Sequence, residues 1–553
     1  MIMKRIYSII GTAILALTLS GCSDYLQKDP PTVISDSNFW TGESDAMLAL
    51  YGCYHWPNGW DHDNFDSAQG LLYLDFAGGN GTEKENFTST MASTATSPTH
   101  MNLTNYWANA YREIANYNTF LDNIGNCPMD ESAKKVMTAE VKSLRAYFFW
   151  CLAFYFQNVP MPLTTLTVEE ANTIMQTPQA DVYSQIETDL KEAINVLPDK
   201  WSGEDYGRAT KGYARTLLGR LYLGQGKYAE AAKVYSDIIA SGQYQIDNSN
   251  GVDSYTKLFQ FAGQKSPESI FFFEFVKDKY TNVRYIYQSP EGAGGWHQFA
   301  VYNELVKEYF CTDGKGIEES EVYNESDPYM NRDPRLYASI YLPPLGSYPG
   351  TVMTNGEIYD CYGNATSPDR YDKFPLFNGY CPRKGIDPDN FAIWSNYVYT
   401  PLMRYAEVLL SYLEALNESA PSQVSQDVLD KTVNAIRARV SLPAYNKNDL
   451  PTQEAVRNAV RKERRVEMAF EGLRYFDVLR WGVAKDLLNH TFTGVKLSDD
   501  PNARNYRGSS PVDEDGYYKF ETRSWDAHNR YFPIPQNDRN VNKNLVQNDG
   551  YSK

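Results

Sequence analysis

Residues 461–481 read RKERRVEMAFEGLRYFDVLRW, and their pattern indicates the element that the rest of the chain packs against. The apolar residues Val466, Phe470, Leu473 and Phe476 recur at spacings of three and four. This spacing places them on one stripe of a helix, which can face a core. We therefore predict one core-facing helix over this stretch.

The same stretch is also highly charged. Glu463, Glu467 and Glu471 stand four residues apart on one line and would repel one another if unpaired. The opposite charge within one turn comes from Arg461, Arg464, Arg465 and Arg474. A solvated, salt-bridged helix is one interpretation, but the aromatic side chains leave little room for a wide polar face. We expect some of these charges to be partly buried and paired, because burying them unpaired costs several kcal/mol.

Paired carboxylates also occur in acid and base catalysis, so Glu467 and Glu471 are catalytic candidates in principle. Nearby arginines hold carboxylates ionised and deny either of them the raised pKa of a general acid. We therefore expect no catalytic residue in this stretch.

The N-terminus has the pattern of a bacterial lipoprotein signal. Lys4 and Arg5 precede an apolar run over 6–17 that is too short to span a bilayer, and Ser20 and Gly21 directly precede Cys22. We predict a signal peptide over 1–21, lipidation of Cys22 and a proline-containing tether over 22–35. Several acyl chains on Cys22 give stable attachment to a membrane without spanning it.

Composition excludes some partners. The 52 basic and 69 acidic residues give a net charge of −17, which disfavours nucleic acid and anionic lipid. After Cys22 the cysteines show no CxxC spacing, which argues against a structural zinc site, whereas a disulfide between Cys361 and Cys381 stays open. The 43 tyrosines outnumber the 25 phenylalanines, which favours some rings on a surface or in a groove.

The order of patterns along the chain predicts a mainly α fold with few short strands. Helical periods appear over 105–124, 133–156, 181–198, 403–418 and 424–440. Residues 207–244 resemble a tetratricopeptide helix pair, and such pairs must stack to bury their apolar stripes. In that pair we expect Ala214 and Gly219 on the first helix to face Tyr228, Ala231, Ala232 and Tyr235 on the second.

We expect one domain over 36–553 with two contrasting parts. The predicted helical scaffold covers about 36–245 and 401–481, and a loop-rich, ligand-binding part covers about 258–400. The tail over 490–553 is expected to wrap the surface, and its proline and asparagine content argues against a helix over 530–551.

Irregular segments in a large domain often bind ligands. In residues 52–100, Trp56 and Trp60 flank a Pro-Asn-Gly turn, where a ring can stand exposed. Asp61, Asp63 and Asp66 nearby suggest a structural calcium ion, but the glycine and terminal glutamate of an EF-hand are missing. We therefore expect no cofactor, with structural calcium as an open alternative.

Several motifs in order resemble the SusD/RagB family, the starch-utilisation type of outer-membrane nutrient-binding lipoproteins of Gram-negative bacteria. Besides Cys22 and the 463–481 stretch, the matching segments are WANAYREIANYN from Trp107, Arg145-Ala146-Tyr147, 207–211 (GRATK), 331–335 (NRDPR), 404–407 (RYAE), 532–535 (FPIP) and 547–551 (QNDGY). Together they cover nearly the whole mature chain.

The resemblance implies a single helical domain with tetratricopeptide-like units packed against an irregular ligand-binding part. It also implies a lipid-anchored lid on the cell-surface face of the outer membrane. Such a lid captures glycan fragments and delivers them to a TonB-dependent transporter of the SusC type. The binding residues of the family do not transfer by motif, because the recognisable segments are scaffold.

The candidate binding residues therefore rest on physical reasoning. Flat rings present a face to the C–H face of a sugar, and polar neighbours bond its hydroxyls. The candidates are Trp56, Trp60, Tyr73, Asp75, Trp296 and His297, with Gly294 and Gly295 allowing close approach to the backbone.

Three other functions remain as alternatives to glycan binding. The same fold can bind a peptide or another nutrient, because peptides also stack on aromatic grooves. A glycoside hydrolase needs two carboxylates across a cleft, and no motif singles out such a pair. A helical-repeat adaptor does not need such long inserted loops.

Overall fold

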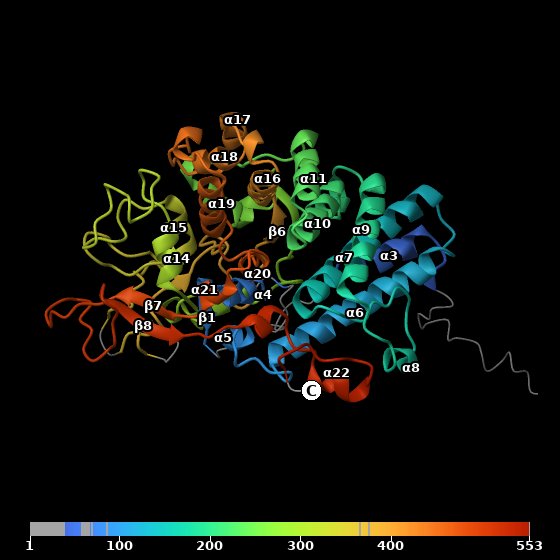
Figure 1. Ribbon diagram of the computed structural model, residues 1–553, viewed down its shortest axis with the longest axis horizontal. Coiled ribbons are helices and arrows are strands. Elements are labelled where there is room, and N and C mark those ends of the chain that lie inside the picture. Colours follow the sequence, from blue (N-terminus) through green and yellow to red (C-terminus); the bar gives the residue numbers. More distant parts are fainter. Residues whose placement is uncertain are drawn as a thin grey trace, which may run out of the picture.

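The structure is a computed structural model in which most of the long helices lie at one end of the molecule, whereas long loops, strands and a few short helices lie at the other (Figure 1). It describes residues 39–56, 67, 70–84, 87–363, 366–373 and 377–551. Cys22, Trp60 and the predicted signal and tether lie outside the described residues. Among the described residues, no helix combines the length and the apolar character that crossing a membrane requires.

Eight of the longer helices pack one against the next in a single array (Figure 1). In order of contact they are α3 (Glu43–Cys53), α6 (Met101–Ile124), α7 (Glu131–Phe156), α9 (Gln179–Val196), α10 (Lys211–Gly224), α11 (Tyr228–Ser241), α16 (Tyr405–Ser419) and α19 (Gln453–Glu467). Each helix buries its apolar stripe between two neighbours, as stacked helix pairs must. The predicted helices over 105–124 and 133–156 correspond to α6 and α7.

The pair α10 and α11 packs as its sequence predicts. Ala214 and Ala231 are fully buried, and Gly219 lies under the ring of Tyr235. A Cβ at position 219 would stand 2.3 Å from that ring, so only glycine allows this approach. The small residues of the pattern therefore set the distance between the two helices.

Short helices connect the longer ones. The α-helices are α4 (Gly70–Asp75), α5 (Phe87–Met91), α8 (Val168–Ala171), α12 (Ser254–Leu258), α13 (Arg284–Gln288), α14 (Asn303–Glu308), α15 (Pro334–Ser339), α17 (Gln426–Lys431), α18 (Val433–Arg439), α20 (Arg474–Arg480), α21 (Ala484–Leu488) and α22 (Gln536–Val541). The π-helix is η2 (Phe76–Asn80), and the 3-10 helices are η3 (Gly203–Asp205), η4 (Gly251–Asp253), η5 (Phe261–Gly263), η6 (Glu291–Ala293), η7 (Pro421–Gln423), η8 (Lys447–Asp449) and η9 (Ala527–Arg530).

The strands form small antiparallel pairs. These are β1 (Gly81–Glu83) with β3 (Phe299–Val301), β2 (Ser269–Phe273) with β6 (Thr400–Arg404), β4 (Ile340–Tyr341) with β5 (Cys381–Pro382), and β7 (Thr491–Lys496) with β8 (Tyr517–Thr522). The β2–β6 pair places Ser269 opposite Arg404, one residue before α16 begins. This strand pair therefore connects the loop-rich part to the helical array. Because helices predominate and the strands are few and short, the predicted mainly α fold class is confirmed.

The prediction of one helix over 461–481 is wrong, because the stretch forms two helices. Helix α19 ends at Glu467, α20 begins at Arg474, and between them Phe470 and Gly472 have φ values of 68° and 80°. The Asp75 carboxylate accepts the N–H groups of both residues, at 2.9 Å from Phe470. A carboxylate from a distant segment thus accepts the backbone N–H groups that the break leaves without helical partners. The spacing of apolar residues carries no information about this break.

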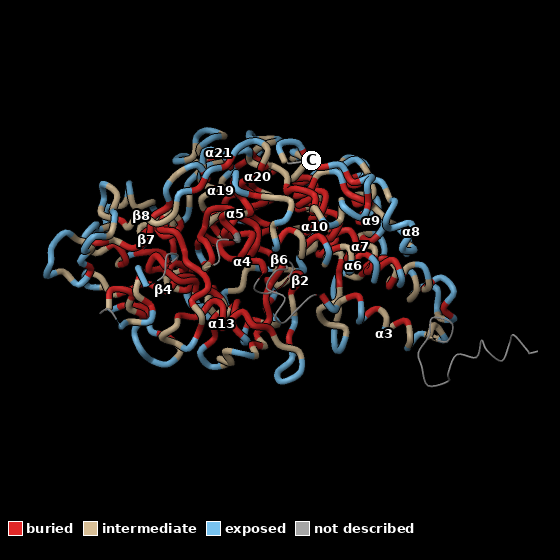
Figure 2. Tube along the Cα trace, turned by 90° about the horizontal axis from the view of Figure 1, so that it is seen from below, coloured by how far each residue is buried: buried red, intermediate tan, exposed pale blue. Residues whose placement is uncertain are grey.

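The acidic side chains of this stretch are buried and paired, as expected, but their main partners are not its own arginines. Glu463, Glu467 and Glu471 bind cations from the 335–439 region. These partners are Arg335, Lys384, Arg404, Arg437 and Arg439. Figure 2 shows the centre of the molecule, where these segments meet, as mostly buried. The 461–481 stretch thus joins distant parts of the chain through charge.

Three further details differ from the sequence expectations. The helix predicted over 424–440 is interrupted at Thr432, whose hydroxyl donates to the carbonyl of Val428 at 2.6 Å and competes with the backbone. The tail contains the short helix α22, which begins directly after Pro535, whose backbone is extended at the N-cap. Cys361 and Cys381 are buried free thiols, so the disulfide left open is not formed. The domain boundaries stay predictions.

Candidate ligand-binding site

Three of the predicted ligand-binding residues lie in the core. Tyr73 and Asp75 in α4 are 1% and 0% exposed, and His297 is 1% exposed. Asp75 holds the break between α19 and α20, and burial raises its pKa to about 6 despite its N–H donors. These residues support the fold from within and do not reach a ligand in this conformation. Trp60 and the aspartates of the calcium alternative lie outside the described residues.

Trp296 forms an exposed aromatic pair with a residue that the sequence reasoning missed. The ring of Trp296 is partly buried and meets the ring of Trp394 edge to face, with 5.6 Å between ring centroids and 83° between planes. Trp394 is 54% exposed. Behind them, Tyr287 packs against Trp296 at 5.1 Å. We call Trp296 and Trp394 the tryptophan pair.

The loop before Trp296 is built to hold it in place. The N–H of Trp296 donates to the carbonyl of Ile286 at 2.7 Å, so the chain folds back onto α13. Gly294 has φ 85°, and a Cβ at Gly295 would stand 2.1 Å from the carbonyl oxygen of Ser289. The glycines predicted to allow ligand approach instead allow the backbone to close this loop.

His297 and Asp369 anchor the same loop from below. His297 Nδ1 lies 3.1 Å from Asp369 Oδ1, and the carboxylate also accepts the N–H groups of Glu291 and Gly292 at 2.7 and 2.9 Å. Burial acts to raise the pKa of Asp369, but the hydrogen bond and charge of His297 outweigh it and lower that pKa. His297 is thus a positioning residue for Trp296.

The segment that carries Trp394 is fixed at both ends. The backbones of Asn396 and Asn282 exchange two hydrogen bonds of 2.9 and 2.7 Å. At the other end, Phe391 stacks on Tyr285 with 5.4 Å between centroids. The exposed ring therefore projects from a short turn whose ends do not move freely, which favours a defined binding surface.

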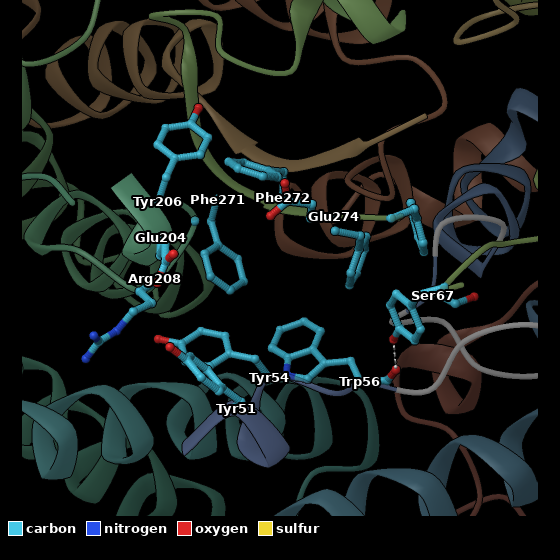
Figure 3. A pocket seen from close by; sticks show the side chains of 14 residues that line it. Tyr51, Tyr54, Trp56, Ser67, Glu204, Tyr206, Arg208, Phe271, Phe272 and Glu274 are labelled. Atoms are coloured by element: carbon cyan, nitrogen blue, oxygen red, sulfur yellow. Dashed lines mark hydrogen bonds between the residues drawn. The ribbon is translucent and has the colours of Figure 1, made fainter. Parts of the chain in front are cut away.

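Trp56 lies at a second aromatic feature, a cavity of about 270 Å³ between the α3 side and β2 (Figure 3). Its ring is 3% exposed and stacks on Tyr147 at 5.1 Å, so it forms the floor of the cavity and not an exposed platform. The other rings that line the cavity are Tyr51, Tyr54, Tyr206, Phe271, Phe272, Phe273, Phe275 and Tyr280.

The charged groups that line the cavity differ in whether they form ion pairs. Arg208 is turned away from the cavity (Figure 3) and donates to Glu140 at 3.0 Å and to Asp205 at 2.6 Å. Glu204 and Glu274 are exposed at the lining, and neither makes an ion pair within the described part of the chain. The cavity is therefore aromatic, and two of its carboxylates make no ion pair among the described residues.

No cluster of three or more metal-ligating side chains occurs among the described residues. The buried carboxylates of the 463–471 stretch are paired with cations, and Arg439, Arg404 and Arg335 outweigh burial and hold the pKa of Glu467 well below its usual range. Burial also acts to raise the pKa of Glu471, but Arg404 and Lys384 outweigh it and lower that pKa, so neither Glu467 nor Glu471 has the raised pKa that a general acid requires.

Trp394 had a weak signal in the sequence. It stands in FAIWSNY over 391–397, directly after the polar turn residues DPDN. A tryptophan in a turn has no regular element to bury it, which is the argument that singled out Trp56. Its pairing with Trp296, almost a hundred residues away in the chain, is visible only in the folded molecule.

Comparison with known proteins agrees with this architecture. The model of the SusD family matches residues 248–551, which is more than half of the chain. The chain belongs to the SusD family. A second family model, described as starch-binding associating with outer membrane, matches residues 33–223. The recognition made from the sequence motifs is therefore confirmed.

Individual members of the SusD family match over most of their length. A SusD-like carbohydrate-binding protein from Bacteroides fragilis has a crystal structure similar to this one, with a TM-score of 0.82 and 29% identity, covering 92% of this chain and 100% of that one. SusD-like protein P25 from Formosa agariphila is 24% identical, over 88% of this chain and 91% of the relative. Starch-binding protein SusD from Bacteroides thetaiotaomicron is 23% identical, over 79% and 77%.

Proposed function

We propose that this SusD-family protein binds a glycan at the tryptophan pair. The observation that carries the proposal is the exposure of Trp394, at 54%, beside the ring of Trp296. A half-exposed indole beside a second indole gives a ligand an apolar surface to stack on, with its N–H edge free for water. Two indoles at 83° form a corner in which a sugar ring can stack on one face and touch the other edge.

Polar groups beside the corner suit sugar hydroxyls. Asn355 Nδ2 donates to the carbonyl of Gly292 at 2.9 Å, in the loop that precedes Trp296. Glu291 in the same loop pairs with Lys84 at 3.6 Å and with Lys373. Such groups orient a ligand while the aromatic surface supplies most of the binding free energy. The names of the matched relatives, which include starch-binding and carbohydrate-binding proteins, support a glycan as the ligand class.

The proposal extends to delivery and anchoring. The captured glycan passes to a SusC-type TonB-dependent transporter, while acyl chains on Cys22 hold the protein at the cell-surface face of the outer membrane. The family-model description that names association with the outer membrane supports this location. The predicted signal peptide over 1–21, directly followed by Cys22, supports the anchor.

The role in this proposal is binding without catalysis. A glycoside hydrolase needs two carboxylates about 5 to 10 Å apart across its cleft, one of them with a raised pKa. Glu291, five residues before Trp296 in the chain, has its charge paired with two lysines. Glycan capture without bond cleavage is the simpler use of this surface.

Isothermal titration of the detergent-solubilised mature protein against plant, host and microbial glycans tests the proposal, with peptide mixtures as controls. We expect heat with one glycan class and no release of reducing ends. Trp394→Ala should weaken that binding by roughly 30-fold, the effect of losing about 2 kcal/mol at a tryptophan hot spot. Its free energy of unfolding should change by about 1 kcal/mol or less, because the ring is more than half exposed.

Tyr506→Ala is the matched control, because this ring is 44% exposed and lies between β7 and β8. It should bind the glycan like the unmodified protein. Binding heat from peptides and from no glycan would contradict the glycan proposal and would favour a peptide as the ligand of this fold. Reducing ends released over time would overturn the non-enzymatic role, and unchanged binding by Trp394→Ala would remove the tryptophan pair from the site.

A further inference from the structure

The aromatic cavity at Trp56 is separate in its residues from the tryptophan pair, and its chemistry points to a different ligand group. We propose that this cavity binds an ammonium group, presented by an amino sugar or by the amine of a peptide side chain. The proposal uses only described residues of the α3 side, β2 and the 204–208 segment.

The first argument is the density of rings around one small space. Tyr51, Tyr54 and Trp56 line one side, and Phe271 and Phe272 lie across from them (Figure 3). Phe273 and Phe275 also line the cavity. Aromatic faces carry partial negative charge and attract a cation within about 6 Å of the ring centroid, most strongly where water is excluded. A cavity walled by rings favours a cation with an apolar body over a neutral polar group.

The second argument is the sign of the nearby charges. Glu274 accepts a hydrogen bond from Gln264 at 2.7 Å and has no cation within 4.0 Å among the described residues. Lys265 influences Glu274 only from beyond ion-pair distance. Glu204 is exposed at the same lining, and Arg208 is already held by Glu140 and Asp205. Among the described residues, no cation forms an ion pair with Glu204 or Glu274.

The third argument is size and accessibility. A volume of about 270 Å³ is near the lower end of the range for small-molecule sites, about 300 to 1,000 Å³, so it suits a single sugar unit or an amine side chain. Tyr51 is 47% exposed at the lining, so the cavity opens to solvent beside an accessible ring. The net charge of −17 adds a long-range field that attracts cations and weakens with salt.

Titration of the detergent-solubilised mature protein at low salt tests the proposal with defined probes. Glucosamine and Nα-acetyl-lysine methylamide both carry an ammonium group, and N-acetylglucosamine is the neutral counterpart of the first. We expect at least one ammonium probe to bind and N-acetylglucosamine to bind about 10-fold more weakly or not at all. The tighter of the two ammonium probes identifies the source of the amine.

Substitutions locate the binding. Glu274→Gln and Tyr51→Ala should each weaken the bound ammonium probe several-fold, whereas Glu318→Gln, an exposed glutamate between α14 and α15, should not. Trp394→Ala should leave ammonium binding unchanged, which separates this site from the proposed glycan site. Equal binding of glucosamine and N-acetylglucosamine, no binding of either ammonium probe, or indifference to both cavity substitutions would each overturn the proposal.

Discussion

Gly472 shows how much one residue decides in the stretch between α19 and α20. Its φ is 80°, a conformation that L side chains rarely adopt, and a Cβ there would stand 2.8 Å from Leu71 Cδ2 and 3.3 Å from Leu71 Cβ. Phe470, two residues earlier, has φ 68° and has no such freedom, so it carries strain that the surrounding packing compensates. The direction of α20 depends on these two positions.

Gly472→Ala should therefore destabilise the protein for two reasons, backbone strain and the close contact with Leu71. Gly482→Ala is the matched control, because Gly482 has φ 68° but no atom within 4 Å of an added Cβ. We expect about 1 kcal/mol for the control and on the order of 3 kcal/mol for Gly472→Ala, measured by urea unfolding. Equal losses would show that Leu71 moves aside without cost.

At the scale of elements, α16 is joined by charge to the end of α20. Glu414 in α16 accepts two hydrogen bonds of 2.7 Å, from Arg480 Nη2 and from Trp481 Nε1. Burial acts to raise the pKa of Glu414, but Arg480 outweighs it and lowers that pKa to about 2. The pair holds the short helix α20 against the helical array.

The pH dependence of stability follows from this shift. The pKa of Glu414 is lower in the folded protein than its ordinary value of 4.5, so its contribution is present above pH 4.5 and is lost between about pH 4.5 and 2. Glu414→Gln should lose on the order of 3 kcal/mol at pH 7 and should flatten the decline of unfolding free energy in that window. Chemical unfolding at several pH values measures both.

Glu230→Gln provides the comparison for this substitution, since Glu230 is exposed on α11 and makes no ion pair among the described residues. It should reproduce the pH profile of the unmodified protein. A Glu414→Gln profile that also overlaps with the unmodified one would show that the α16–α20 pair does not depend on this charge.

At the scale of the whole molecule, a buried network of ion pairs unites the loop-rich part with the helices. Its acidic members are Glu268, Asp333, Glu463, Glu467 and Glu471, and its basic members are Arg335, Lys384, Arg404, Arg437 and Arg439. The formal charges cancel, which is the condition under which buried charges are tolerated. Most of these ion pairs join segments that are far apart in the chain, while Asp333 and Arg335 pair within one segment.

Arg404 occupies the centre of this network, because it binds Glu268, Glu467 and Glu471 at 2.6 to 2.7 Å. Arg404→Met should cost on the order of 4 kcal/mol or more, since it leaves buried carboxylates without their cation. Unfolding free energy, or the yield of soluble protein if folding fails, measures the loss.

Arg457→Met removes a more exposed ion pair with Glu418 and should cost about 1 kcal/mol or less. A small effect of Arg404→Met, similar to that of Arg457→Met, would mean that the network does not hold the two parts together.

The sequence by itself determined the features that depend on local spacing. The apolar periods of α6, α7, α10 and α11 predicted those helices. The small residues Ala214 and Gly219 predicted the close packing of α10 on α11. Burial of the 461–481 stretch and pairing of its glutamates also followed, because a crowded aromatic helix has no wide polar face. The order of the motifs along the chain was enough to identify the SusD family from the sequence.

Only the tertiary structure decided which distant groups meet. Folding brings Glu467 together with cations from β6, α15 and α18. It also places the Asp75 carboxylate at the break after α19, and it buries Tyr73 and His297 in the core. It also brought Trp394 beside Trp296. The physical reason is that the spacing of side chains along the sequence determines which face of a helix or strand is apolar. Which distant residues come into contact depends on how all the helices, strands and loops pack together.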